Sequence, residues 1–191
     1  MSTFDAISRF FETEYPLNQA GLAELFGAFS IQRLPKGTLL LTGDEPDQYL
    51  RFLNRGIVRE FYSTGDRESN LTFYLEPQFI SDFSAFMHQR DTHKFQESLT
   101  EVEQLSIGRT QFFELLERYQ CGKAFIHQTF AELLAKQEDR AYERMTKKPE
   151  ELYQILLEKR PNWLREIPQY HIASYLNITP ETLSRLRKRI S

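Results

Sequence analysis

The chain has 191 residues, of which 40% are hydrophobic, and a formal net charge of −3. This length allows one domain or two small ones, and no stretch approaches the roughly 20 apolar residues that span a bilayer. The single cysteine, Cys121, excludes an internal disulfide and an iron–sulfur cluster, and the acidic N-terminus is unlike a signal peptide. We therefore expect a cytoplasmic protein without a membrane partner.

Residues 3–29 show helical periodicity. Apolar side chains recur every three or four positions on both sides of Pro16, first at Phe4, Ile7, Phe10 and Phe11 and then at Leu22, Leu25, Phe26 and Phe29. This pattern predicts two amphipathic helices.

From about Ser30 to Ser106 the pattern changes to short apolar or alternating runs, which are TLLLT, YLRFLN, IVREFY, NLTFYL and EVEQLSI. Turn signals separate them at Pro35-Lys36-Gly37, Gly43-Asp44, Asn54-Arg55-Gly56 and Thr64-Gly65-Asp66. Several short strands at this spacing predict an antiparallel sandwich or roll, and the lack of helical stretches between them argues against a parallel sheet.

Helical periodicity returns at about Thr110, in a short segment followed by a long one from about Lys123 to Met145. The long segment would span about 35 Å at the standard rise of a helix. Its apolar stripe comprises Ile126, Phe130, Leu133, Leu134, Ala141 and Met145. The stripe either packs on the roll or is covered by a second copy of the chain; we favour the second copy, and hence a homodimer. A further helix is expected from Pro149 to Arg160-Pro161.

Residues 167–191 have the pattern of a helix-turn-helix. The inner face of the predicted pair is formed by Ile172, Ala173, Leu176, Leu183 and Leu186. Asn177 stands at the turn, where a left-handed conformation is needed, and Thr179 is placed to cap a helix that starts at Pro180. A small helical hairpin with a basic, solvated end would share some of these features.

Charge is distributed unevenly along the chain. Residues 1–146 hold 15 Lys and Arg against 22 Asp and Glu, whereas residues 147–191 hold 9 against 5, so that the net charges are −7 and +4. A basic terminal module on an acidic body favours binding of the module to a polyanion. This distribution supports the nucleic-acid interpretation of the helix-turn-helix.

The whole arrangement resembles the Crp/Fnr superfamily of bacterial transcription regulators. The resemblance rests on LPKGTLLLTGDEPDQYLRFLNRGIVREFY, with glycines at 37, 43 and 56, and on ITPETLSRLRK near the end. It implies an α+β fold: an N-terminal double-stranded β-helix, that is, a jelly roll like the cyclic-nucleotide-binding domain, then a long dimerisation helix and a C-terminal helix-turn-helix domain. The corresponding domains are residues 1–120, 121–146 and 147–191.

In members that bind cyclic AMP, a Gly-Glu pair holds the ribose and an Arg-Ser pair holds the phosphate. These positions fall at Ser81-Asp82 and near Thr92-His93. No arginine therefore occupies the phosphate position, and Arg90 would have to change direction to contact a phosphate there. Because a buried phosphate without a paired cation is costly, we expect no bound cyclic nucleotide and a degenerate sensor. A pocket for an unknown effector would be lined by Phe79, Ser81, Asp82, Phe83, Ser84, Thr92 and His93, although its aromatic residues also fit a plain core.

The resemblance places the second helix of the pair in the major groove of double-stranded DNA. Glu181 would accept from a cytosine amino group and Arg185 would donate to guanine, whereas Pro180 stands where the family commonly has a base-contacting arginine. The expected DNA-contacting residues are Gln169, Tyr170, Thr179, Pro180, Glu181, Thr182, Ser184, Arg185, Lys188 and Arg189. A dimer would present two such helices about 34 Å apart to an inverted repeat.

Two other functional classes compete with this interpretation. One is a ligand-binding regulatory module of the cyclic-nucleotide-binding type that acts on protein partners and keeps a vestigial helix-turn-helix. The other is an enzyme, which the sequence argues against because it holds no metal-spaced His/Cys cluster, phosphate-binding glycine loop or serine elbow. We expect no cofactor, and an activator would also need a surface for RNA polymerase, which no residue pattern identifies.

Overall fold

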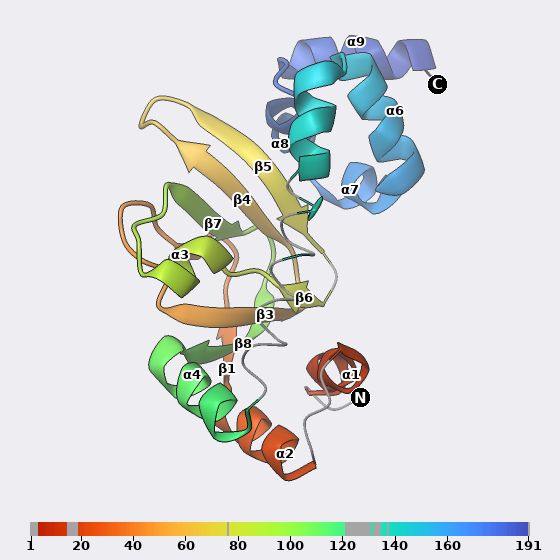
Figure 1. The fold of residues 1–191 in the computed structure, drawn as a ribbon. Coiled ribbons are helices and arrows are strands. Elements are labelled where there is room, and N and C mark those ends of the chain that lie inside the picture. Colours follow the sequence, from red (N-terminus) through yellow and green to blue (C-terminus); the bar gives the residue numbers. More distant parts are fainter. Residues whose placement is uncertain are drawn as a thin grey trace. The chain divides into compact units, whose positions relative to one another are not determined.

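The computed structural model describes residues 4–14, 19–75, 77–120, 131, 135–136 and 138–190. They form an α+β structure with antiparallel sheets (Figure 1). Residue contacts divide the chain into two compact units, Met1–Arg59 with Tyr74–Ala131, and Glu60–Phe73 with Glu132–Ser191. The three-domain division expected from the sequence stays a prediction.

Two four-stranded sheets form the β-structure. In the first the strand order is β1 (Ser30–Leu34), β8 (Val102–Gly108), β3 (Tyr49–Arg55) and β6 (Gln78–Phe79), and each pairing is antiparallel. In the second the order is β2 (Leu39–Leu41), β7 (Lys94–Ser98), β4 (Val58–Ser63) and β5 (Glu68–Tyr74). The predicted antiparallel arrangement is confirmed.

Apolar residues from several strands fill the interior of the first unit. Its core cluster consists of Leu53, Val58, Ile80 and Val102. The turn between β3 and β4 needs glycine at Gly56, where φ is +105° and an added Cβ would lie 2.4 Å from the carbonyl oxygen of Glu101. The glycine predicted as a turn signal is therefore required by both backbone conformation and space.

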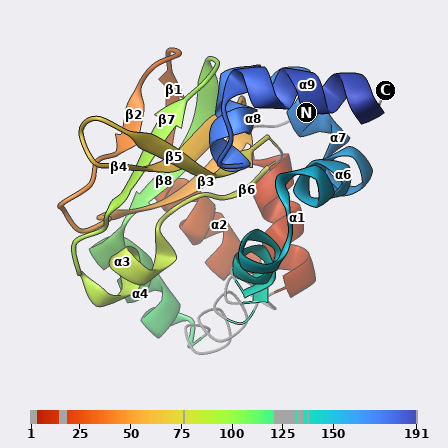
Figure 2. The same cartoon turned by 90° about the horizontal axis from the view of Figure 1, so that it is seen from above.

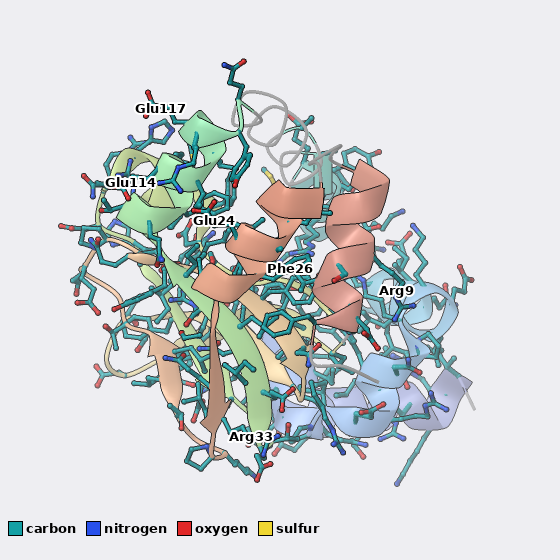
Figure 3. All side chains as sticks on the ribbon, turned by 90° about the horizontal axis from the view of Figure 1, so that it is seen from below. Arg9, Glu24, Phe26, Arg33, Glu114 and Glu117 are labelled. Atoms are coloured by element: carbon teal, nitrogen blue, oxygen red, sulfur yellow. The ribbon has the colours of Figure 1, made fainter. Side chains whose placement is uncertain are left out.

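The described residues of the first unit include the helices α1 (Asp5–Glu14), α2 (Gln19–Ala28), α3 (Phe83–His88) and α4 (Arg109–Arg118). The two predicted N-terminal helices are confirmed, with Ile7 and Leu25 buried. Helices α2 and α4 pack together through Glu24, which pairs with Arg118. Figure 3 shows Glu24 and Phe26 on α2 and the exposed Glu114 and Glu117 on α4.

The second unit contains the C-terminal helices α6 (Pro149–Lys159), α7 (Pro161–Glu166), α8 (Gln169–Tyr175) and α9 (Pro180–Ile190), which gather in one cluster (Figure 2). A helical stretch at 138–146 ends before Lys147, as the sequence predicts. Helix α6 also starts and ends where expected. Helix α7 was not predicted, because Pro161 was interpreted only as a stop signal.

Most of the predicted dimerisation stripe lies outside the described residues, namely Ile126, Phe130, Leu133 and Leu134. Ala141 is described and is an exposed helical residue. Two neighbours on the same stretch are also exposed, Tyr142 by 66% and Met145 by 87%. Among the described residues, no helix has the length and apolar character needed to cross a membrane.

Candidate nucleic-acid interface

Helices α8 and α9 form the two-helix unit that the sequence predicts. The predicted inner-face residues Ile172, Ala173, Leu176, Leu183 and Leu186 are all buried. Asn177 adopts the expected left-handed conformation, with φ at +56°, and the next amide donates to the carbonyl oxygen of Ala173 at 3.0 Å. The small side chain of Ala173, which is fully buried, lies where the pair is packed.

The start of α9 is capped as expected. The Thr179 hydroxyl accepts from the amide of Thr182 at 3.2 Å, which satisfies one of the free amides of the first turn. At the same end, hydrogen bonds from its own backbone amide and from Thr179 lower the pKa of the Glu181 carboxyl. Glu181 is therefore an ionised acceptor at neutral pH.

The remaining side chains of the pair form a polar surface. Nine of the ten predicted DNA-contacting residues are exposed and Thr182 is half-buried; the nine are Gln169, Tyr170, Thr179, Pro180, Glu181, Ser184, Arg185, Lys188 and Arg189. The Thr182 hydroxyl accepts from Arg185 Nη2 at 3.2 Å, and Arg189 pairs with Glu150 of α6 at 3.1 Å. Arg185 thus lies one turn beyond the start of α9, with its guanidinium tethered on the exposed side.

The predicted effector residues of the first unit are mostly engaged within the protein. Asp82 is buried and caps α3 by accepting from the Ala85 amide at 3.4 Å. Its other carboxylate oxygen accepts from the Thr92 hydroxyl at 2.6 Å, and Lys94 Nζ lies 3.4 Å from the first oxygen. The carboxylate at the position that corresponds to the ribose-holding pair therefore already has three internal partners.

The other residues of that set make separate contacts or are exposed. Ser81 accepts from the Arg51 amide at 2.7 Å and donates to the Tyr49 carbonyl oxygen at 3.0 Å. Phe83 is buried against Phe86, and Phe79 packs on Phe52. Ser84 is exposed, and the side chain of His93 is 84% exposed, 3.8 Å from Asp44.

Sequence reasoning missed a buried ion pair beside these residues. Arg51 Nη2 donates to the Asp47 carboxylate at 2.6 Å, and the same carboxylate oxygen accepts from the Asp82 amide at 2.9 Å. Burial raises the pKa of the Asp47 carboxyl in spite of the nearby Arg51. Asp47 lies two residues before β3 and Arg51 lies within it, so the helical i, i+4 rule for ion pairs does not apply to them. Among the described residues, no group of three His, Cys, Asp or Glu side chains is arranged to hold a metal ion.

Solved structures similar to this one are regulators of the Crp/Fnr type. The c-di-GMP responsive global regulator CLP of Xanthomonas campestris matches with a TM-score of 0.69 and 16% identity, over 91% of each chain. FixK2 from Bradyrhizobium japonicum matches with a TM-score of 0.67 and 18% identity, over 85% of this chain and 84% of its own. For the catabolite activator protein of Thermus thermophilus the values are 0.57 and 17%, over 92% and 84%.

At these identities the likeness establishes the fold, which is that of the catabolite activator protein with its cyclic-nucleotide-binding-like β-structure. No family model and no curated protein matches the sequence. CLP is a global regulator, and the protein from Thermus thermophilus is a catabolite activator.

Proposed function

We propose that this protein is a DNA-binding transcription regulator in which α8 and α9 act as a helix-turn-helix. The observation that carries the proposal is the exposed polar and basic surface of α9. Buried Leu183 and Leu186 pack that helix against α8, and Thr179 caps its start. The exposed side chains of α9 therefore project from a stably packed helix. This combination of a supported helix and an uncovered basic surface is what insertion into the major groove requires.

The positions on α9 suggest separate roles. Glu181 and Arg185 are one turn apart on the exposed side, with Glu181 ionised to accept from cytosine and Arg185 free to approach guanine O6 and N7 on exchange of its bond to Thr182. Lys188 and Arg189, further along, suit phosphate contacts, as do Gln169 and Tyr170 at the start of α8. Pro180 has no polar side chain, so the operator should differ from one contacted by arginine there.

Self-association would come from the helix that precedes Lys147. Ala141, Tyr142 and Met145 follow one another at helical i, i+1 and i+4 spacing and are all exposed. Exposed apolar groups along a helix favour a partner that covers them, and a second copy is the partner that an inverted-repeat operator needs. We therefore propose a homodimer.

The sensor would be degenerate. The ribose position is occupied by Asp82, which is used in capping α3 and in pairing with Thr92 and Lys94. A nucleotide would have to break these buried contacts without a matching arginine for its phosphate. An unknown effector, and RNA polymerase as a further partner, stay open within this proposal.

The most direct experiment is in vitro selection of DNA with the purified protein, with and without cyclic AMP. We expect enrichment of one inverted repeat to the same extent in both arms. Failure to enrich any sequence would contradict DNA binding and favour the alternative, a ligand-binding regulatory module acting on protein partners. Enrichment only with cyclic AMP would contradict the degenerate sensor.

A further inference from the structure

Strand β5 is the edge strand of its sheet, so one row of its backbone groups needs partners from outside the sheet. Ser174 of α8 supplies two of them. Its hydroxyl accepts from the Asn70 amide at 3.1 Å and donates to the Glu68 carbonyl oxygen at 3.2 Å. The Ser174 side chain thus forms the hydrogen bonds with Glu68 and Asn70 that a neighbouring strand would otherwise form.

Asn70 extends this contact from the strand side. Its side chain is only 1% exposed, and its amide nitrogen donates to the His171 carbonyl oxygen at 3.1 Å and lies 3.3 Å from His171 Nδ1. Arg144 approaches the Asn70 carbonyl oxygen at 3.5 Å. The side-chain nitrogen and the backbone carbonyl oxygen of Asn70 therefore both contact residues of the second unit's helices.

The contact continues in both directions along the strand. Arg67 donates to the side-chain oxygen of Asn177, the residue that forms the turn between α8 and α9, at 2.8 Å. At the other end Phe73 meets the ring of Trp163 edge-on, with centroids 5.0 Å apart, and Trp163 meets Tyr175 of α8 at 5.3 Å. Buried aromatic contacts of this kind add apolar stabilisation to the polar ones. We call Arg67, Glu68, Asn70 and Phe73 the docking edge.

The docking edge leaves the DNA-facing surface open. It contacts α8 at His171 and Ser174 and the following turn at Asn177. The side chains of Gln169, Tyr170 and Arg185 remain exposed. A contact that masked the reading helix would have to cover these residues. The docking edge instead contacts α8 and the turn after it without covering these residues.

We infer that the docking edge of β5 positions the helix-turn-helix for DNA binding, with Ser174 and Asn70 as positioning residues that do not touch DNA. The inference rests on the proposed function. Because Glu68 and Asn70 contact α8 and Arg67 contacts the turn before α9, a change in β5 would be transmitted to the direction in which α9 projects. Loosening the edge should therefore weaken operator binding while leaving the phosphate contacts in place.

The test compares Ser174→Ala with wild type and with Ser8→Ala, a matched change on α1. Amide hydrogen exchange at Asn70 is measured for each protein alone and with the selected operator, and operator affinity is measured over a range of salt concentrations. Ser174→Thr, which keeps the hydroxyl, serves as the rescue variant. Arg67→Ala provides a second variant at an exposed position in case Ser174→Ala does not fold.

We expect faster exchange at Asn70 in Ser174→Ala, operator affinity at least roughly fivefold weaker, and an unchanged salt dependence, because one hydrogen-bonded hydroxyl but no phosphate contact is lost. Ser174→Thr should restore affinity, and operator should leave Asn70 protected in wild type. Arg67→Ala should also weaken binding without changing the salt slope; a slope reduced by about one would make Arg67 a phosphate contact instead.

Tighter operator binding by Ser174→Ala, or deprotection of Asn70 by operator, would overturn the inference by showing that DNA binding must break the contact. Unchanged affinity in Ser174→Ala would also overturn it. If wild type binds no DNA, the proposed function fails, whereas exchange at Asn70 in the protein alone still reports whether the docking edge forms.

Discussion

Asp47 and Arg51 form a buried ion pair in which burial changes the pKa of the carboxyl group. Both side chains are almost fully buried, at 0% and 5% exposure, and burial raises the pKa of Asp47 more than the attraction of Arg51 lowers it. The folded protein therefore binds a proton at Asp47 more readily than the unfolded chain does. It follows that this site's contribution to the free energy of unfolding falls as pH rises from the unfolded pKa, about 3.9, through the higher folded value.

We predict that Asp47→Asn removes this pH dependence. Wild type should lose stability relative to Asp47→Asn as pH rises from about 4 towards neutrality, as measured by urea unfolding at a series of pH values. Glu103→Gln is the control of opposite sign, since hydrogen bonds from Asn54 and Arg33 lower the pKa of Glu103. Its wild-type contribution is present above the unfolded pKa and lost as pH falls through the folded one. A gain in the stability of wild type relative to Asp47→Asn as pH rises would mean that Arg51 outweighs burial.

At the same scale, sequence reasoning identified residues whose role is local and missed those whose role is tertiary. Asn177 and Thr179 could be assigned because a left-handed turn and a helix cap depend on a few neighbouring residues. Asp82 could be placed by resemblance, but its three internal partners come from α3, from β7 and from Thr92 just before β7, and the sequence gives no signal of these contacts. The contact of Asn70 with His171 joins residues 101 positions apart and has no sequence signal.

Among the elements, α9 is the one on which the proposed function depends most. Its start is capped by the Thr179 side chain, whose hydroxyl accepts from the Thr182 amide. We predict that Thr179→Ala lowers the free energy of unfolding of the folded protein by about 1 kcal/mol, the usual cost of losing such a cap. Thermal unfolding measures the effect, and Ser184→Ala, an exposed change on the same helix, should alter stability much less. Equal effects of the two substitutions would show that the cap is not made in solution.

Two physical causes account for three elements that the sequence did not predict, namely β1, β7 and α7. Strands β1 and β7 carry few apolar residues, and β7 buries the polar side chains of Gln96 and Ser98, so neither shows a hydrophobic alternation. Helix α7 begins at Pro161, which is as well suited to the first position of a helix as to the end of the preceding one. Periodicity detects an element only where its buried side is apolar.

At the scale of the whole molecule, the proposal requires two copies. We predict that the double substitution Tyr142→Lys with Met145→Lys shifts the protein from dimer to monomer at micromolar concentration, because it places like charges where the two helices would meet. Light scattering measures the mass, and Tyr62→Lys, a change at another exposed tyrosine, is the control. Wild type that is itself a monomer would contradict the dimer, and a dimer that survives the double substitution would place the interface elsewhere.

The order of elements along the chain was largely predictable because its sequence patterns differ. They are apolar stripes at helical spacing, short strands separated by glycine turns, and a basic terminal segment. The two compact units were not, since residues 60–73 cluster with the C-terminal helices although they lie within the strand region. That association depends on β5 meeting α8, which only the folded chain reveals.

The central claim is that α9 recognises DNA through Arg185, and one titration tests it most directly. Wild type and Arg185→Ala are titrated against the selected operator and against an unrelated duplex of the same length. Loss of a bidentate contact to guanine, worth about 1–3 kcal/mol, predicts operator affinity weaker by about 5- to 150-fold and a much smaller change on the unrelated duplex. Unchanged operator affinity, or an equal loss on both duplexes, would contradict the assignment of Arg185 to a base.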